Sequence, residues 1–272
     1  MSETLTRGEK IMRAVTADAQ SMISRGVYLN EARMIARTYK AAGCTEIIDL
    51  GCSTGVLGLR MIQQTNPSRY VAIDANPYCV DHANMLLEQE VPKTPKEFHK
   101  YTIMPSYIDP NTKVRGAIQS LIHTSSLFTV SDQTIEFDTP ALHVDNVVNY
   151  IRPTSFVKID VEGVDLDIVV SFLNQNLLPP AFQFEVQESQ LNDVSIVNIL
   201  RELRDRGYKV PSIDDVRGCV FSTINTSKTL GSVINAKRWP QKTMEGYRRI
   251  ASTEFEVEAW EVRDVQPWEL RR

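Results

Sequence analysis

The chain has 272 residues, of which 42% are hydrophobic and 24% are charged, and its formal net charge is −4 at pH 7. This composition is typical of a globular protein with a hydrophobic core and excludes an intrinsically disordered chain. The small negative charge gives no general attraction for nucleic acid or an anionic membrane, so we expect neither as a partner.

Two further features of the sequence bear on where the protein works. The first residues lack the apolar segment of a signal peptide, and no apolar run approaches the roughly 20 residues that span a bilayer. The cysteines form no CxxC pair, which indicates reduced thiols and no zinc site. They are Cys44, Cys52, Cys79 and Cys219. We therefore expect a cytoplasmic protein without a membrane span.

The predicted elements begin with a helical region over residues 1–42, which we expect on the substrate side as a cap. Apolar residues recur at helical spacing from residue 6, and Gly43 is a typical helix terminator. From residue 43 to 223, short apolar runs alternate with helical segments, a pattern that predicts a doubly wound, mostly parallel α/β sheet. The predicted strands cover residues 46–50, 70–73, 101–104, 156–160 and 182–186, and the predicted helices residues 56–64, 79–89, 165–173 and 194–206.

Three parts of the chain depart from this alternation. Residues 110–152 form an insertion, in which residues 127–130 and 135–137 flank a turn and predict a β-hairpin. Residues 208–210 and 219–222 follow one another without a helix and predict one antiparallel hairpin at a sheet edge. Residues 224–272 form a C-terminal extension for which the sequence predicts no topology.

The segment IIDLGCSTGVLGLRMI predicts a ligand-binding turn. A strand ends at Asp49, and Gly51 and Gly55 lead into a helix, at the edge where a parallel sheet binds its ligands. Asp49 can balance the positive end of a ligand, and Asp74, which ends the next strand, can hold ribose hydroxyls. The candidate cofactor-binding residues are Asp49, Gly51, Cys52, Ser53, Gly55, Asp74, Ala75 and Asn76.

Two cofactors are compatible with this turn. A dinucleotide-binding oxidoreductase normally carries G-x-G-x-x-G, whereas the middle glycine is missing here, where the turn has Ser53. Asp49 also suits a cationic ligand better than a pyrophosphate. The pattern therefore favours S-adenosylmethionine, with the oxidoreductase as an alternative.

A second unusual segment is SFVKIDVEG, where charges interrupt a strand that should be apolar on both faces. Lys158, Asp160 and Glu162 alternate and would share one face of an extended chain. Buried charges are costly unless they are paired. The three residues therefore indicate either a polar network at the ligand-binding edge or a structural ion pair.

With these segments in view, the sequence resembles the FkbM family of S-adenosylmethionine-dependent methyltransferases. The likeness covers roughly residues 43–223 and rests on DLGCSTG, on KIDVEG and on Phe184-Glu185, with Ser125-Ser126-Leu127 and LHVDNVV before the KIDVEG block. Asp74 stands where many members have glutamate. The resemblance implies a class I methyltransferase fold and O-methylation of a hydroxyl on a sugar or a natural-product-like small molecule.

A hydroxyl acceptor benefits from a base that takes its proton. Asp160 and Glu162 are the leading candidates, Lys158 is their charge partner, and His123 is a second candidate base. No ligand set specific for a metal is evident. The alternative from another class is a non-catalytic subunit that keeps the donor loop and serves as a binding partner. The sequence leaves the acceptor and the oligomeric state open.

Overall fold

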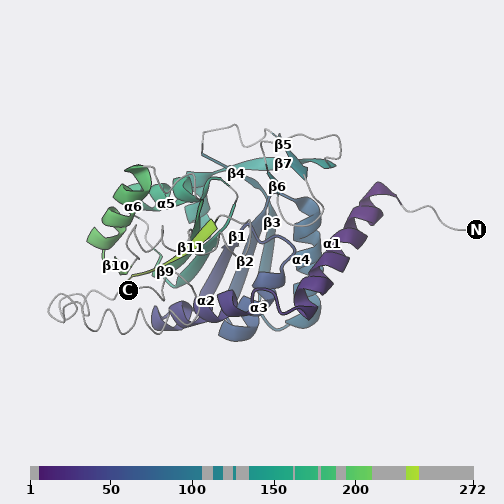
Figure 1. Ribbon diagram of the computed structural model, residues 1–272, viewed down its shortest axis with the longest axis horizontal. Helices are drawn as coiled ribbons and strands as arrows, with labels where there is room; N and C mark the ends of the chain where they lie inside the picture. Colours follow the sequence, from purple (N-terminus) through teal and green to yellow (C-terminus); the bar gives the residue numbers. More distant parts are fainter. Residues whose placement is uncertain are drawn as a thin grey trace, which may run out of the picture.

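The structure is a computed structural model of the chain. It describes residues 6–105, 113–118, 125–126, 135–161, 163–176, 179–187, 194–209 and 231–238. Figure 1 shows one large sheet with helices packed around it and a second, smaller sheet above. Among the residues described, no helix is long and apolar enough to cross a membrane.

The large sheet has seven strands in the order β10-β11-β9-β8-β1-β2-β3, and the five strands from β9 to β3 in this order are parallel. The strands are β1 (Glu46–Leu50), β2 (Arg69–Asp74), β3 (Lys96–Lys100), β8 (Ser155–Ile159), β9 (Ala181–Gln187), β10 (Tyr208–Lys209) and β11 (Gly231–Arg238). β2 lies on one side of β1 and β8 on the other, so the chain reverses its direction across the sheet between β1 and β8. In doubly wound sheets, ligands bind at the carboxyl ends of the strands at such a switch point.

Helices cover both faces of this sheet. One face packs under α2 (Leu29–Ala41), α3 (Val56–Thr65) and α4 (Pro77–Glu90), and its core includes Ile47, Tyr70 and Phe156. The other face packs against α5 (Asp165–Asn174), α6 (Val194–Asp205) and the 3₁₀ helix η1 (Val144–Tyr150), with Val157 and Phe184 in its core. The structure therefore confirms the predicted doubly wound α/β fold.

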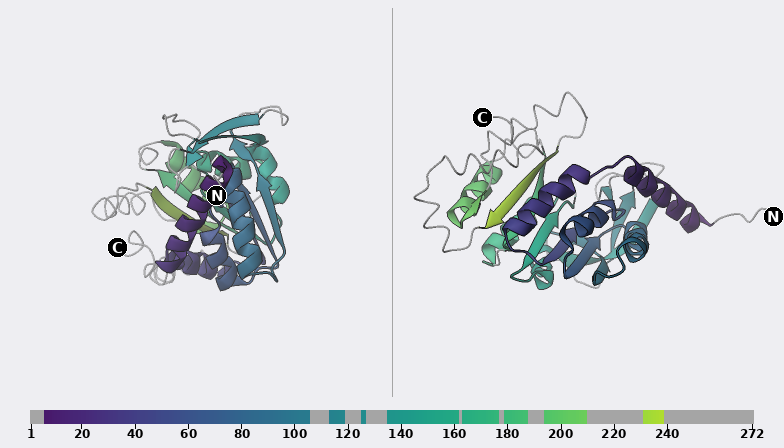
Figure 2. Two further views of the ribbon diagram at one scale, coloured as in Figure 1. Left: turned by 90° about the vertical axis from the view of Figure 1, so that its right-hand side faces the viewer. Right: turned by 90° about the horizontal axis from the view of Figure 1, so that it is seen from below.

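The predicted N-terminal helical region consists of two helices. α1 (Arg7–Ser24) begins with a capping box between Thr6 and Glu9, and it packs against α3 and α4. A tight connection ends at Tyr28, and α2 then contacts α3, β9 and β11. Figure 2 shows α1 at one end of the molecule and α6 with β11 at the opposite end.

The insertion contributes most of a second sheet, with the strand order β4-β7-β5-β6. These strands are β4 (Thr102–Met104), β5 (Lys113–Ile118), β6 (Ser125–Ser126) and β7 (Ile135–His143). Thr102 and Thr139, both buried, share a hydrogen bond of 2.7 Å between β4 and β7. Figure 1 shows β5 and β7 crossing above the carboxyl ends of β2 and β3. The insertion thus lies on the side where a doubly wound sheet binds ligands.

Three details differ from the sequence prediction. The third strand of the large sheet is β3, whereas the predicted segment 101–104 supplies β4 of the small sheet. In the insertion, the hairpin segment 127–130 lies outside the described residues, and segment 135–137 belongs to β7, which pairs with β5. The antiparallel partner of β10 is β11, and the predicted partner, residues 219–222, lies outside the described residues. The sheet therefore continues beyond the predicted boundary at residue 223.

Candidate active site

The glycine turn after β1 lies where three loops meet. Gly51 has a φ of 76°, and a Cβ added to it would overlap the backbone carbonyl of Asp160 in the loop after β8. Gly55 has a φ of 81°, and its added Cβ would lie 2.7 Å from that of Ala83 in α4. Both positions combine a left-handed backbone with close neighbours, a combination that only glycine tolerates without strain.

Asp74, at the end of β2, ties this turn to the next loop. One carboxylate oxygen accepts a hydrogen bond from the backbone N–H of Ser53 (2.8 Å) and the other accepts one from Asn76 (2.7 Å). Burial raises the pKa of Asp74, while these N–H groups oppose the shift. A carboxylate has about four lone-pair sites, so two remain for the hydroxyls of a ribose.

The other predicted donor-loop residues have different positions. Cys52 is buried, and burial raises the pKa of its thiol. The side chain of Asn76 caps α4 by accepting hydrogen bonds from Tyr78 and Cys79. Ser53 is exposed with a φ of 47°, and Ala75 is partly buried. The side chain of Cys52 therefore packs in the protein interior, and that of Asn76 serves as the cap of α4.

Asp49 lies beneath the turn and is fully buried. Tyr70 donates a hydrogen bond to one of its carboxylate oxygens (2.5 Å), and the Nζ atom of Lys158 lies 3.3 Å from the other. One oxygen thus has a hydrogen bond, and the other has an ion pair but no hydrogen bond among the described residues. This placement differs from the expectation that Asp49 itself faces the positive end of a ligand.

Lys158 is the centre of a buried charge cluster on β8. Its ammonium group donates to the carbonyls of Leu50 (3.3 Å) and Gly51 (2.6 Å), and it lies 3.4 Å from Asp160 Oδ2. Burial alone would lower the pKa of Lys158, but the surrounding carboxylates raise it above its usual value. Lys158 therefore stays charged and holds the start of the glycine turn in place.

Asp160 follows β8 directly, and its side chain is 44% exposed. Its backbone N–H donates to the carbonyl of Leu50, which fixes it beside the end of β1. The structure thus brings Lys158 and Asp160 together with the glycine turn, at the switch point of the sheet. Glu162 and His123, the other predicted catalytic residues, lie outside the described residues.

Two further polar residues join this cluster, and sequence reasoning missed them. Gln183, buried on β9 in register with Lys158, donates a hydrogen bond of 2.6 Å to Glu31 in the first turn of α2. Burial raises the pKa of Glu31, and Lys158 opposes that shift. Gln183 stands between Phe182 and Phe184 in the predicted strand over residues 182–186, so the sequence does show a polar residue inside this strand. Glu31 could not be recognised in the sequence, because an acidic residue is common in the first turn of a helix.

Asp165 is a second carboxylate whose burial the sequence did not reveal. It begins α5, is 4% exposed, and accepts a hydrogen bond from the backbone N–H of Gly163 (3.4 Å). Burial, and then the charge of Asp160, raise the pKa of Asp165 to about 6. Asp160, directly after β8, and Asp165, at the start of α5, thus have different environments.

The charges of this site fit a cationic ligand. Three carboxylates, those of Asp49, Asp160 and Glu31, surround the single ammonium group of Lys158. Surplus negative charge near the protein interior is unfavourable unless a cation offsets it. The sulfonium and ammonium groups of S-adenosylmethionine fit this surplus, whereas the pyrophosphate of a dinucleotide would be repelled. Among the residues described, no group of three or more His, Cys, Asp or Glu could hold a metal ion.

The strand order, with antiparallel β11 between β9 and β10, and the ligand-binding turn after β1 define a class I methyltransferase fold. A family model described as the methyltransferase FkbM domain matches residues 58–210, which is more than half of the chain. The chain therefore belongs to the FkbM methyltransferase domain family, and the predicted family is confirmed. Among curated proteins, none matches the sequence.

Several solved methyltransferase structures are similar at low identity. Magnesium protoporphyrin IX methyltransferase from Synechocystis PCC 6803, with bound S-adenosylmethionine, is 11% identical with a TM-score of 0.41, covering 88% of this chain and 87% of that one. An rRNA methylase from Streptococcus thermophilus is 9% identical (TM-score 0.40, 77% and 95% covered). A dimethyladenosine transferase from Plasmodium falciparum is 9% identical (TM-score 0.44, 85% and 66% covered). At this similarity, none of them bears on what this chain methylates.

Proposed function

We propose that this methyltransferase uses S-adenosylmethionine and methylates a hydroxyl group on a small molecule, such as a sugar or a natural-product-like compound. One observation carries the proposal. Asp160 is a substantially exposed carboxylate at the switch point of the sheet, and Lys158 and the glycine turn hold it there. A carboxylate in that position can serve as the base for a hydroxyl.

Each part of the site has a separate task in this proposal. When bound, S-adenosylmethionine supplies a methyl group on a positively charged sulfur. Asp74 would hold the ribose hydroxyls, and Gly51 and Gly55 would let the backbone approach the ligand. Asp160 would accept the proton that the acceptor hydroxyl loses as its oxygen bonds to the methyl carbon, while the bond between that carbon and the sulfur breaks and S-adenosylhomocysteine is left. Much of the rate in such a displacement comes from the positioning of the two reactants.

Two alternatives make different predictions for the same site. A non-catalytic subunit would bind the donor but would have no use for an exposed carboxylate next to it. A dinucleotide-dependent oxidoreductase would need a site for a pyrophosphate, and the carboxylates around Lys158 disfavour one. The exposed Asp160 therefore supports a methyltransferase over both.

The proposal is tested by calorimetric titration of the purified protein with S-adenosylhomocysteine. We expect binding by the wild type, and a loss of about tenfold or more in the Asp74→Ala variant, because hydrogen bonds to a charged group contribute roughly 1.5–3 kcal/mol. Asp81→Ala is a matched control, since Asp81 is 54% exposed on α4 and pairs with Lys100. Preferential binding of a nicotinamide dinucleotide would contradict the proposal.

A further inference from the structure

A polar row crosses the sheet just below the carboxyl ends of three neighbouring strands. Asp49 on β1 is in register with Lys158 on β8, and Lys158 is in register with Gln183 on β9. Register partners on parallel strands face the same side of a sheet, and here that side lies under α2 and α3. All three residues are at least 98% buried. Burying such a row inside a sheet costs free energy of folding unless every polar atom has a partner.

The two ends of the row have different partners. At the β1 end, one oxygen of Asp49 accepts a hydrogen bond from Tyr70, and the other has no hydrogen bond among the described residues but lies 3.3 Å from the ammonium group of Lys158. At the β9 end, the amide nitrogen of Gln183 donates to Glu31, but its oxygen is buried and has no hydrogen-bond partner among the described residues. A buried, unpaired amide oxygen next to a carboxylate is a site for a group with several N–H donors.

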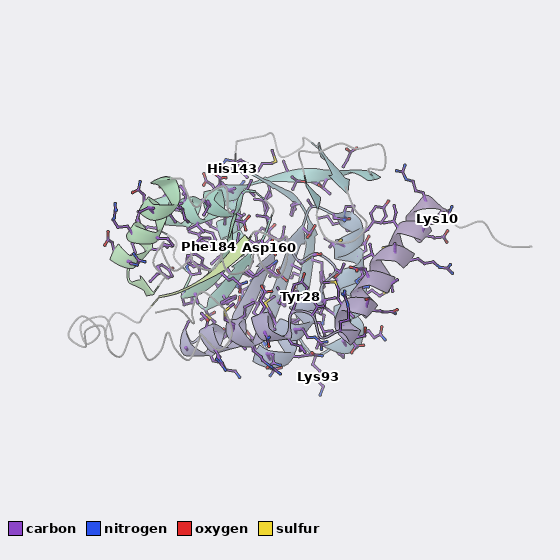
Figure 3. The ribbon with its side chains drawn as sticks, viewed as in Figure 1. Lys10, Tyr28, Lys93, His143, Asp160 and Phe184 are labelled. Carbon is purple, nitrogen blue, oxygen red and sulfur yellow. The ribbon has the colours of Figure 1, made fainter. Side chains whose placement is uncertain are left out.

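Helix α2 brings Glu31 to this end of the row. The N-cap residue of the helix is Tyr28, which has a left-handed φ of 65° and makes no side-chain capping hydrogen bond. A tyrosine in that conformation is strained, and such strain is concentrated at functional sites. Tyr28 and Glu31 are three residues apart and share one face of the helix. Figure 3 shows Tyr28 below Asp160 in this view, and Tyr28 interacts electrostatically with Glu31, Lys158 and Asp160.

We propose that Glu31 and Gln183 form the subsite that binds the ammonium group of the donor's methionine portion. The ammonium would donate to the Glu31 carboxylate and to the unpaired oxygen of Gln183. The subsite rests on the proposed function, because it assumes S-adenosylmethionine as the donor. It assigns to α2 the task that the sequence suggested for Asp49, whose side chain is fully buried against Tyr70 and Lys158.

The order of the strands agrees with the shape of the donor. Asp74, which would hold the ribose, is on β2, and Gln183 is on β9, three strand spacings or about 14 Å away along the row. The sulfur of the donor is next to its ribose end, and the ammonium is at the far end of the methionine chain. Asp160, directly after β8, lies between these two positions, one strand spacing from β9 and two from β2.

The proposed subsite also predicts how the stability of the protein changes when the charge of Glu31 is removed. Burial raises the pKa of Glu31, so the unliganded protein loses stability as the pH rises through that pKa and the carboxylate ionises. Glu31→Gln removes this charge and can still accept the hydrogen bond from Gln183. We therefore expect a melting temperature at neutral pH that is no lower than that of the wild type.

The test compares two ligands that differ only in the amino-acid portion. S-Adenosylhomocysteine carries the ammonium group, and 5′-methylthioadenosine lacks the whole amino-acid portion. In calorimetry, Glu31→Gln should bind S-adenosylhomocysteine about tenfold or more weakly and 5′-methylthioadenosine as tightly as the wild type does. Gln183→Met, which keeps most of the volume, should show the same selective loss. Glu88→Gln, a 58% exposed carboxylate on α4, is the charge-matched control and should change neither affinity.

The possible outcomes separate the subsite from the proposed function. If Glu31→Gln weakens both ligands equally, or neither, the subsite is wrong while the donor assignment stands. If it lowers the melting temperature and leaves the affinity for S-adenosylhomocysteine intact, Glu31 is a structural residue. If the wild type binds neither ligand, the proposed function fails and the subsite fails with it.

Discussion

Asp160 and Asp49 both pair with Lys158, but only one of them is available to a substrate. The side chain of Asp49 is fully buried, whereas that of Asp160 is 44% exposed. Loss of Asp160 would leave Lys158 with Asp49 and with the carbonyls of the glycine turn. The ion pair between Lys158 and Asp160 can therefore be removed without leaving a buried charge alone, which is the usual source of a large loss of stability.

We accordingly expect Asp160→Asn to change the melting temperature little and to slow methyl transfer by about 10²–10⁴-fold, the usual contribution of a positioned base. Single-turnover transfer and thermal unfolding, measured on the same preparation, test this. Asp81→Asn, which removes an exposed ion pair with Lys100, is the control and should affect neither measurement strongly. A destabilised but fully active Asp160→Asn protein would show that Asp160 is only a structural ion-pair partner.

Asp165 makes stability depend on pH in a predictable direction. Its pKa is raised from 3.8 to about 6, chiefly by burial. The folded protein therefore binds the proton more tightly than the unfolded chain does. This contribution to stability is fully present below about pH 4 and is lost as the pH rises through about 6. A shift of this size corresponds to about 3 kcal/mol.

The Asp165→Asn variant should therefore be more stable than the wild type at pH 7–8, by up to about 3 kcal/mol, and similar to it near pH 4. An asparagine oxygen can still accept the hydrogen bond from Gly163. Urea unfolding at a series of pH values measures the difference. A variant that is less stable than the wild type at pH 8 would mean that the ionised carboxylate stabilises the loop after β8.

At the scale of elements, the sequence predicts the centre of the sheet better than its borders. β1 and β8 are mainly apolar strands with an acidic residue near or just after the carboxyl end, Asp49 in β1 and Asp160 after β8, and both strands lie where the pattern placed them. The sequence does not predict β3, because KEFHK has a single apolar residue, Phe98, among four polar ones. It predicts a strand in the neighbouring segment over residues 101–104 instead, and that segment supplies β4, which pairs with β7.

The same contrast holds for the candidate site. Asp74 and Lys158 stand in motifs whose spacing along the chain predicts their position at strand ends. Glu31 reaches the site only because α2 packs across β9, a contact between segments that are 152 residues apart. No local pattern encodes such a contact. The buried pairing of Asp49 with Tyr70 has the same origin, since it depends on the register of β1 and β2.

At the scale of the whole molecule, the sheet depends on a strand from beyond the predicted domain boundary. β11 lies between β9 and β10 and pairs with both in antiparallel orientation. Its pairing with β9 extends from residue 231 to residue 237 and covers the whole length of β9. β9 also carries Gln183, so the strand that covers this edge supports the candidate site.

A chain ended after residue 230 should therefore be less stable than one ended after residue 238, because only the longer chain retains β11. Without β11, β9 presents a row of unpaired N–H and C=O groups, and exposed edges of this kind promote aggregation. Thermal unfolding and size-exclusion chromatography of the two truncated chains provide the comparison. We expect the shorter chain to melt at a lower temperature, to aggregate, and to bind S-adenosylhomocysteine more weakly. Equal stability and equal binding in the two chains would show that β11 is dispensable for the sheet.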